Sequence, residues 1–284
     1  MYDFFVKLDR RWIFLMMGLA VAIPILTQLK FPETPSPMVM DVYNAIEQLP
    51  EGSNVLLAYD YDPASEGELQ PMASAFTRHC ARKKHNMYFM TLWPQGPPMV
   101  ARSEAILKSE FPDYKYGEDY VSLGFRTGNE GVIKLMTTDL RALYANDVRG
   151  TNLDDIPMTK NLKNIQKMDL IVNVSAGTPG SKEWVQYAAT PYDIKMVAGT
   201  TGVGAPALYP YIPNQLHGVL GAIKAAAEYE QAMMNRYEDL QDNDNAQEGL
   251  RRMGPQLVGH MLMIALIILG NVIYFTQKSR EASR

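Results

Sequence analysis

The side chains best suited to chemistry follow short apolar segments of the sequence. Asp60 and Asp62 come directly after or close behind the apolar run 54–59, and Ser175 follows a second apolar run at 170–174. A carboxylate can exchange a proton with a substrate, and a serine hydroxyl can act as a nucleophile. These three residues are therefore the candidate catalytic residues.

The two aspartates also have a plainer interpretation. The Asp60-x-Asp62 pair is similar to the aspartate pair of haloacid-dehalogenase-type phosphatases, but Ala64 stands where that family has Thr or Val. A matching lysine cannot be placed either. The alternative is a turn that Asp62 and Pro63 begin, with Ser65 capping the helix that follows.

Ser175 and the remaining nucleophiles and metal ligands lack partners in the sequence. Ala and Gly follow Ser175, which does not continue a G-x-S-x-G nucleophile elbow, and no histidine partner is identifiable. None of the four histidines pairs with another ligand at metal-binding spacing, so we predict no metal and no cofactor. The single cysteine, Cys80, is predicted to be packed within a helix, and it excludes an internal disulfide.

Glycine-rich loops follow two of the predicted strands. Such backbone can present free N–H groups to an anion, and Trp93 follows another predicted strand. The run 202–207 fits G-x-G-x-x-A, but it follows the last strand rather than the first and has prolines at 206, 210 and 213, which disfavours a dinucleotide site. The expected ligand-binding residues are Gly177, Gly180, Gly199, Gly202, Gly204 and Trp93.

Strands and helices alternate between residues 51 and 240. Short continuous apolar runs, each followed by a helical pattern, are typical of a parallel sheet covered on both faces. We therefore predict a three-layer, Rossmann-like α/β domain with a mainly parallel sheet, in which ligands bind at the carboxyl ends of the strands. Ser65 and Glu68 indicate a capping box. The predicted strands are 54–59, 87–92, 120–125, 170–174 and 194–198, and the predicted helices are 38–49, 65–84, 100–111, 131–144, 182–188 and 214–240.

Two charge-free apolar runs flank this domain. A helix rises about 1.5 Å per residue, so each run reaches about 27–29 Å, close to the roughly 30 Å of hydrocarbon in a bilayer. The first run is interpreted as an uncleaved signal anchor, because no A-x-A-like site follows it. The predicted order is a cytoplasmic tail (1–11), a transmembrane helix (12–29), a linker and helix (30–50), an extracytoplasmic α/β domain (51–240), a linker (241–255), a transmembrane helix (256–276) and a cytoplasmic tail (277–284).

Basic residues next to both spans predict that the two tails are cytoplasmic. The tails carry +1 and +2, so a chain with net charge −4 leaves −7 for the residues between the spans. An acidic domain disfavours nucleic-acid binding. We expect a bacterial inner membrane, with the main domain in the periplasm. The basic residues are Lys7, Arg10, Arg11, Lys278, Arg280 and Arg284.

The predicted spans contain small and polar residues that favour helix packing. Gly18 and Ala22 have small-x-x-x-small spacing, and His260 and Asn271 are polar groups within the second span. We expect Asn271 to bond a neighbouring helix. The alternatives are ordinary composition for the small pair and, for Asn271, a side chain that reaches the cytoplasmic interface.

No complete catalytic constellation is visible, and this absence shapes the functional expectation. The leading hypothesis is a non-catalytic accessory or scaffold subunit of a larger membrane complex, which binds other membrane-protein subunits or a small anionic ligand. The alternative is a membrane-anchored hydrolase or transferase that uses Asp60, Asp62 and Ser175 with the glycine-rich loops. A ligand-sensing domain that signals through a partner is the third possibility.

Overall fold

The computed structural model describes residues 9–282, with side chains described as far as residue 279. The chain divides into a unit of residues 33–249 and a second unit formed by the segments on either side. Most of the predicted tail 1–11, including Lys7, and the residue Arg284 lie outside the described residues.

The larger unit is built on a six-stranded, fully parallel sheet with the order β3-β2-β1-β4-β5-β6. The chain starts in the middle at β1, builds outward to β3, and then crosses back to β4 to build the other half. This order creates a topological switch point between β1 and β4, where open α/β sheets bind ligands. The strands are β1 (Asn54–Asp60), β2 (Asn86–Thr91), β3 (Tyr120–Phe125), β4 (Leu170–Ser175), β5 (Met196–Thr200) and β6 (Val219–Gly221).

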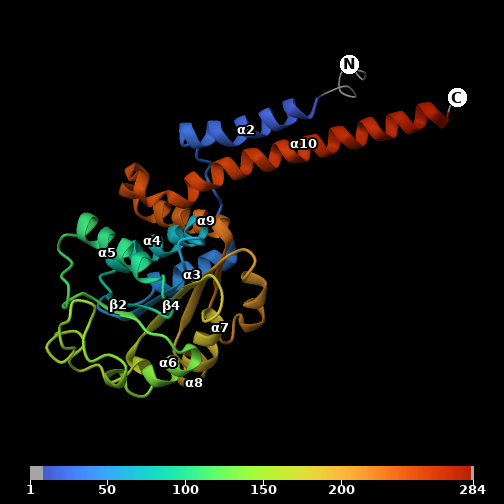
Figure 1. Ribbon diagram of the computed structural model, residues 1–284. Coiled ribbons are helices and arrows are strands. Elements are labelled where there is room, and N and C mark those ends of the chain that lie inside the picture. The colour runs from blue at the N-terminus through green and yellow to red at the C-terminus, as the bar shows by residue number, and fades with distance from the viewer. Residues whose placement is uncertain (1–8, 283–284) are drawn as a thin grey trace. The chain divides into compact units, whose positions relative to one another are not determined.

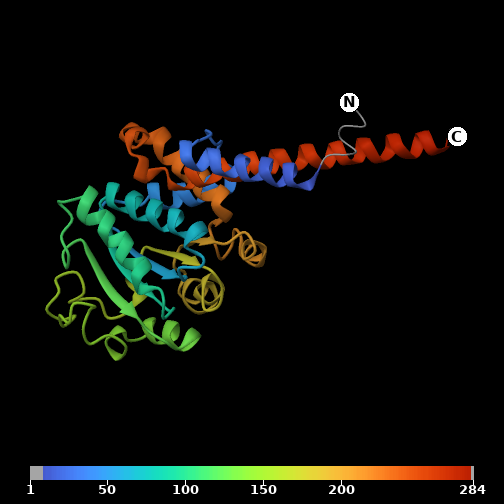
Figure 2. The same cartoon turned by 45° about the horizontal axis from the view of Figure 1, so that its top comes forward.

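Helices cover both faces of the sheet, which confirms the predicted three-layer α/β architecture (Figures 1 and 2). One layer contains α3 (Pro37–Glu47), α4 (Glu66–Arg82), α5 (Pro97–Glu110) and α9 (Ala222–Arg236). The other contains α6 (Asn129–Met136), α7 (Ser181–Trp184) and α8 (Thr190–Tyr192), with the π-helical turn η3 (Val185–Ala189) between the last two. Short 3₁₀ turns are η1 (Leu140–Ala142), η2 (Ile165–Lys167), η4 (Ala205–Ala207), η5 (Tyr209–Tyr211), η6 (Glu238–Asp242) and η7 (Asp244–Ala246).

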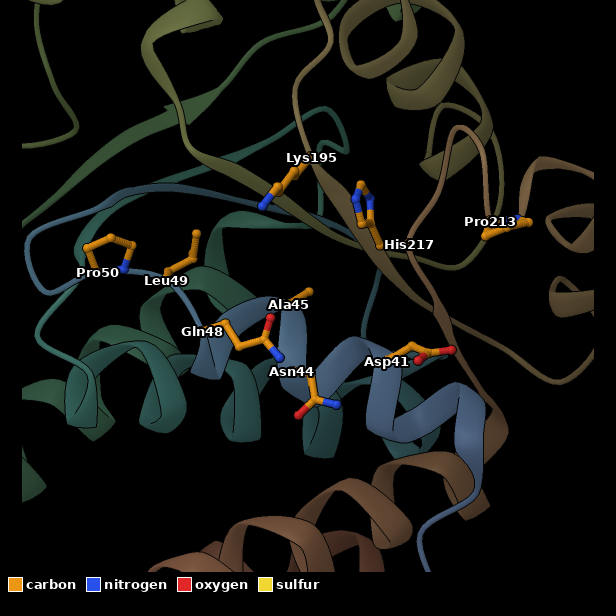
Figure 3. Close-up of a pocket in the computed structure, with 9 residues that line it drawn as sticks. All are labelled: Asp41, Asn44, Ala45, Gln48, Leu49, Pro50, Lys195, Pro213 and His217. Carbon is orange, nitrogen blue, oxygen red and sulfur yellow. The ribbon is translucent and has the colours of Figure 1, made fainter.

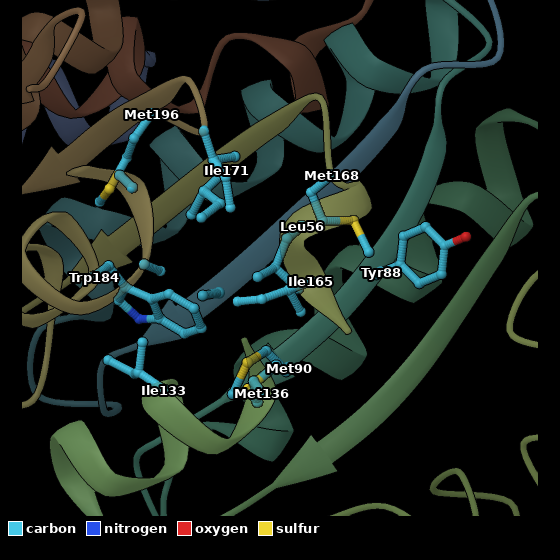
Figure 4. Close-up of a cluster of buried hydrophobic side chains, with 14 of the residues drawn as sticks. Leu56, Tyr88, Met90, Ile133, Met136, Ile165, Met168, Ile171, Trp184 and Met196 are labelled. Atoms are coloured by element: carbon cyan, nitrogen blue, oxygen red, sulfur yellow. The ribbon is translucent and has the colours of Figure 1, made fainter. Parts of the chain in front are cut away.

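Strand β1 shows why the sheet is buried on both faces. Its side chains alternate, so Leu56 and Ala58 enter the apolar cluster under α6 and α7, where Trp184 also packs (Figure 4). Tyr59 points the other way, and its hydroxyl donates to the Ala73 carbonyl of α4. Every β1 residue from Val55 onward is therefore excluded from solvent, which explains the continuous apolar run in the sequence.

Two predicted helices were wrong in part. The predicted helix 214–240 contains β6, and α9 begins only at Ala222; three strand residues are too few to give a periodic signal. The predicted helix 131–144 ends at Met136, and Leu140 and Leu143 belong to or follow η1, a separate turn capped by the Asp139 side chain.

The predicted capping box at the start of α4 does not form. Ser65 has helical backbone angles and makes no side-chain cap hydrogen bond. The Glu68 carboxylate instead accepts a hydrogen bond from the Gly202 N–H at 2.8 Å. The local pattern predicted that Glu68 would bond the backbone at the start of the helix, but its carboxylate bonds the distant Gly202 N–H instead.

A buried polar cluster joins α3, α4 and α9. The ring of His79 is fully buried, with Nε2 2.8 Å from Glu47 Oε2 and Nδ1 2.5 Å from the Tyr229 hydroxyl. Burial lowers the pKa of His79, and the hydrogen bond from His79 lowers the pKa of Glu47 to about 2. A neutral imidazole therefore donates from Nε2 to the carboxylate and accepts the tyrosine proton at Nδ1. Tyr43 stacks on the same ring, with centroids 4.7 Å apart.

The second unit contains α2 (Arg10–Thr27) and α10 (Glu248–Ala282), of which the first residues of α10 belong to the larger unit. Both are long and apolar enough to cross a membrane, by length and composition alone. Part of the predicted linker 241–255 is thus helical. A Cβ at Gly254 would overlap the Leu29 carbonyl oxygen, and one at Gly259 would contact Val21. Glycines of α10 allow this close approach, whereas nothing lies within 4 Å of a Cβ placed at Gly18.

The His79 cluster predicts a large loss of stability on substitution. His79→Ala leaves the Tyr229 hydroxyl and the Glu47 carboxylate without their shared partner, so we expect the free energy of unfolding to fall by about 2–4 kcal/mol. Denaturant unfolding of the full chain in detergent, followed by circular dichroism, measures the loss. The control is His217→Ala, because the His217 side chain is exposed. Equal stability of the two variants would contradict the assigned role.

Candidate functional site

The carboxyl ends of the central strands bring the predicted catalytic residues to one edge of the sheet. Asp60 ends β1 and Ser175 ends β4, and the two residues are paired in the parallel register at the switch point. Thr200 ends β5 and pairs in register with Ser175. Its hydroxyl donates to the Ser175 carbonyl at 3.1 Å. The site is therefore built on rigid strand ends.

Asp60 is a fully buried carboxylate held by three donors. Oδ1 accepts the Leu92 N–H at 2.6 Å. Oδ2 accepts the Asn173 amide at 2.7 Å and the Trp184 indole N–H at 2.9 Å. The donors come from the segment after β2, from β4 and from α7, so one side chain connects three elements around the end of β1.

Burial and hydrogen bonding act on Asp60 in opposite directions. Removal from water raises its pKa, while the three donors favour the ionised form; burial dominates and raises the pKa from 3.8 to about 7. A carboxyl group with such a pKa can both accept and release a proton near neutral pH, which suits acid–base chemistry.

A directed chain of hydrogen bonds runs from Ser175 to Asp60. Ser181 Oγ donates to Asn173 Oδ1 at 2.6 Å, which uses its only hydroxyl proton. The 3.0 Å contact between Ser175 Oγ and Ser181 Oγ must therefore be donated by Ser175. The Asn173 amide completes the chain by donating to Asp60. All of these dipoles point toward the aspartate, as expected around a negative charge.

A hydrogen bond between Trp93 and Pro179, called the latch below, crosses the end of β1. The Trp93 indole N–H donates to the Pro179 carbonyl at 2.7 Å, so the loop after β2 is joined to the loop after β4. Because β2 and β4 are the two neighbours of β1, this bond crosses the strand end that carries Asp60. Gly177 lies beneath the tryptophan ring: a Cβ there would be 3.6 Å from it.

Several N–H groups of the predicted anion nest have internal partners. Gly180 N–H donates to Glu183, Gly202 N–H to Glu68 and Gly204 N–H to Thr201. Gly199 lies within β5. Gly177 and Thr178 are exposed residues, and no described residue accepts a hydrogen bond from their N–H groups.

Asp62 does not belong to the hydrogen-bonded chain that joins Ser175 to Asp60. Its Oδ1 accepts the Ser65 N–H at 3.0 Å, which is the geometry of the turn that the sequence offered as the alternative. The helix residues lie apart as well. Gly18, Ala22, His260 and Asn271 are exposed on α2 and α10, and no hydrogen bond from Asn271 to another described residue is present.

The residues that surround Asp60 were not predicted from the sequence. Asn173 gave the clearest signal, because it is the polar residue within the buried strand LIVNVS. Tyr144 lies fully buried among the described residues with its hydroxyl unpartnered, and burial raises its pKa, with a smaller contribution in the same direction from the ionised Asp60. Arg126, which follows β3, lies 4.3 Å from the centroid of the Tyr144 ring. Arg126 lies outside every predicted element, and Tyr144 is the last residue of the predicted helix 131–144.

The described residues contain no group of three or more His, Cys, Asp or Glu side chains that could hold a metal ion. Two cavities lie at the opposite, amino-terminal edge of the sheet. One is lined by α3 and the segments before β5 and β6 (Figure 3), and the other by the starts of β1 and β2 and the segment before β4.

No family model and no curated protein matches this chain. Among solved structures, it is similar to the C-terminal domain of a glycosyl transferase group 1 family protein from Francisella tularensis. The identity is 11% and the TM-score 0.33, over 79% of this chain and 93% of that domain. The structural neighbour is a transferase domain and not a scaffold subunit, so the non-catalytic scaffold expected from the sequence finds no support and is not proposed. A likeness at this TM-score carries no argument about activity or residue roles, so the proposal below rests on the geometry of this chain.

The Trp93 latch gives a prediction that needs no substrate. Trp93→Phe keeps an aromatic ring but deletes the donor to Pro179, so we expect residues 176–181 to exchange their amide hydrogens about tenfold faster, the effect of one lost hydrogen bond. Hydrogen exchange followed by mass spectrometry measures it. Trp12→Phe, an exposed tryptophan of α2, is the matched control. Unchanged protection of this loop would show that the bond does not hold it.

Proposed function

We propose that this chain is a membrane-anchored hydrolase or transferase whose reaction takes place at the switch point between β1 and β4. The observation that carries the proposal is Asp60: a buried strand-end carboxyl group with a pKa near neutrality, bonded through a directed chain to a strand-end serine. The original alternative also used Asp62, but the turn geometry of that residue supports no catalytic part for it.

Asp60 would act as the acid–base group of the transfer. As an attacking water or alcohol bonds to the electrophilic atom of the donor, the carboxylate takes the O–H proton. The bond to the leaving oxygen breaks with its electron pair, and that oxygen receives the proton back from Asp60. The exposed N–H groups of Gly177 and Thr178 would stabilise negative charge on the reacting group. Access requires opening of the latch between Trp93 and Pro179.

The membrane anchor is the second part of the proposal. Two apolar helices with spanning length support it, as do the basic residues Arg10 and Arg11 at the start of α2 and Lys278 near the end of α10. Both ends would lie in the cytoplasm of a bacterium and the α/β domain in the periplasm. Within the bilayer, the exposed Asn271 would hydrogen-bond a helix of another subunit, because an unpaired amide in hydrocarbon is costly.

The catalytic proposal predicts a pH-dependent loss of activity on substitution of Asp60. The full chain in detergent is assayed on p-nitrophenyl esters, phosphates and glycosides, with and without an alcohol acceptor. Activity should rise with pH as Asp60 ionises near pH 7, and Asp60→Asn should lower kcat by about 10²-fold or more.

Two variants sharpen that assay. Ser175→Ala should lower the rate as well, whereas Asp155→Asn, an exposed aspartate with no side-chain partner among the described residues, should not. A rate for Asp60→Asn equal to that of the parent chain would overturn the proposal, and so would the absence of turnover in every substrate class.

The orientation predicts which sites react with a membrane-impermeant maleimide in intact cells whose outer membrane is permeabilised. Cys80 is fully buried and gives little background. Lys182→Cys, on the surface of the α/β domain, should be labelled, whereas Arg11→Cys should react only after the inner membrane is broken. Labelling of the two sites in the reverse order would contradict the proposed orientation.

A further inference from the structure

A cavity of about 440 Å³ lies at the amino-terminal edge of the sheet, away from the strand ends that carry Asp60 (Figure 3). Its volume lies within the range that binds small molecules. One wall is α3, and the other is formed by the segments that lead into β5 and β6. The lining residues are Asp41, Asn44, Ala45, Gln48, Leu49, Pro50, Lys195, Pro213 and His217.

The α3 wall presents a polar stripe. Asp41, Asn44 and Gln48 are spaced i, i+3 and i+7, so they share one face of the helix. The opposite face carries Val42 and Ile46, which are fully buried in the core. Burial of the apolar face fixes the rotation of α3, and Asp41, Asn44 and Gln48 line the cavity from the other face.

The strand wall carries the positive charge of Lys195, which precedes β5, and the imidazole of His217, which precedes β6. The backbone at both positions is tied to the sheet, because the Lys195 carbonyl accepts the Ile171 N–H at 2.8 Å and the His217 N–H donates to the Met196 carbonyl at 2.9 Å. These side chains therefore start from well-anchored backbone, although they belong to loops.

The Lys195 ammonium and the Asp41 carboxylate, which line the cavity, have no side-chain partner among the described residues. Neither the Lys195 ammonium nor the Asp41 carboxylate forms an ion pair or a side-chain hydrogen bond with any described residue. The amides of Asn44 and Gln48, which lie on α3 with Asp41, make no side-chain hydrogen bond with the described residues either. One cavity thus offers a free cation, a free anion and two free amides.

We propose that this cavity binds a small zwitterion that carries an ammonium and a carboxylate group, such as a free α-amino acid. The ligand carboxylate would pair with Lys195 and His217, its ammonium group with Asp41, and the amides would bind the remaining polar atoms. A simple anion would meet the Asp41 carboxylate, and a simple cation would meet the Lys195 ammonium. Only a ligand with both charges satisfies both walls. The proposal is independent of the reaction at the carboxyl edge.

Calorimetric titration of the full chain in mild detergent tests the proposal, with the proteinogenic L-amino acids added one at a time. The best binder is then compared with its N-acetyl derivative, which lacks the ammonium group, and with its amide, which lacks the carboxylate. Each derivative should bind about tenfold more weakly, the cost of one lost charged contact.

Two variants assign the charges to residues. Lys195→Gln should bind the amino acid about tenfold more weakly than the parent chain does, and its affinities for the amino acid and for the amide should be equal. Asp41→Asn should likewise have equal affinities for the amino acid and for its N-acetyl derivative. The matched controls are Lys160→Gln and Asp155→Asn, both exposed and without side-chain partners among the described residues. They should bind as the parent chain does.

Three results would overturn the proposal. The first is no measurable heat with any amino acid. The second is equal binding of the amino acid and its N-acetyl derivative by the parent chain, which would identify an anion site. The third is unchanged discrimination in both variants, which would place the ligand elsewhere. Because the readout is binding, none of these results depends on catalysis at Asp60.

Discussion

The buried carboxylate of Asp60 is the constraint around which the centre of this domain is organised. An ionised carboxylate without water needs donors, and the chain supplies them from the segment after β2, from β4 and from α7. These contacts fix how the loops leave the strands and where α7 begins. The raised pKa shows that they do not fully replace water. Ionised Asp60 therefore destabilises the fold at neutral pH. A carboxyl group that lowers stability in this way is better explained by a role in the reaction than by a role in folding.

The central strands were predictable because a parallel sheet covered on both faces leaves a continuous apolar run, as in β1 and β4. The same logic placed Asp60 and Ser175 at one edge, since both follow such runs and parallel strands end on the same side. The strand order was not predictable from one sequence, and neither was β6, whose pairing with β5 involves only three residues.

The partners of Asp60 escaped sequence analysis for a different reason. Asn173 and Trp184 reach Asp60 over more than one hundred positions of chain, and no local pattern encodes such a contact. The capping box failed for the same reason. Its serine and glutamate have the right spacing, but the Glu68 carboxylate accepts a hydrogen bond from the Gly202 N–H, which is distant in the sequence. The turn at Asp62, in contrast, spans four residues and formed as local chemistry allows.

The two edges of the sheet differ in how their charges are used. At the carboxyl edge, the polar groups around Asp60 and Ser175 are buried and bonded to one another, and the exposed residues Gly177 and Thr178 of the loop after β4 have N–H groups without a protein acceptor among the described residues. At the amino edge, Lys195 and Asp41 are left unpaired around an open cavity. A single sheet thus separates a preorganised polar cluster from a surface recess whose charges are still hydrated.

The bond between Glu68 and Gly202 has a consequence for any anion that approaches the loop after β5. The carboxylate already occupies the N–H donor that such a ligand would use, and it is tethered to α4, so it competes at a high effective concentration that dilution cannot lower. An anionic ligand must displace the Glu68 carboxylate from this N–H group in order to bind, and this competition weakens the affinity for the ligand. After release, the glutamate can return to the vacated donor and limit rebinding.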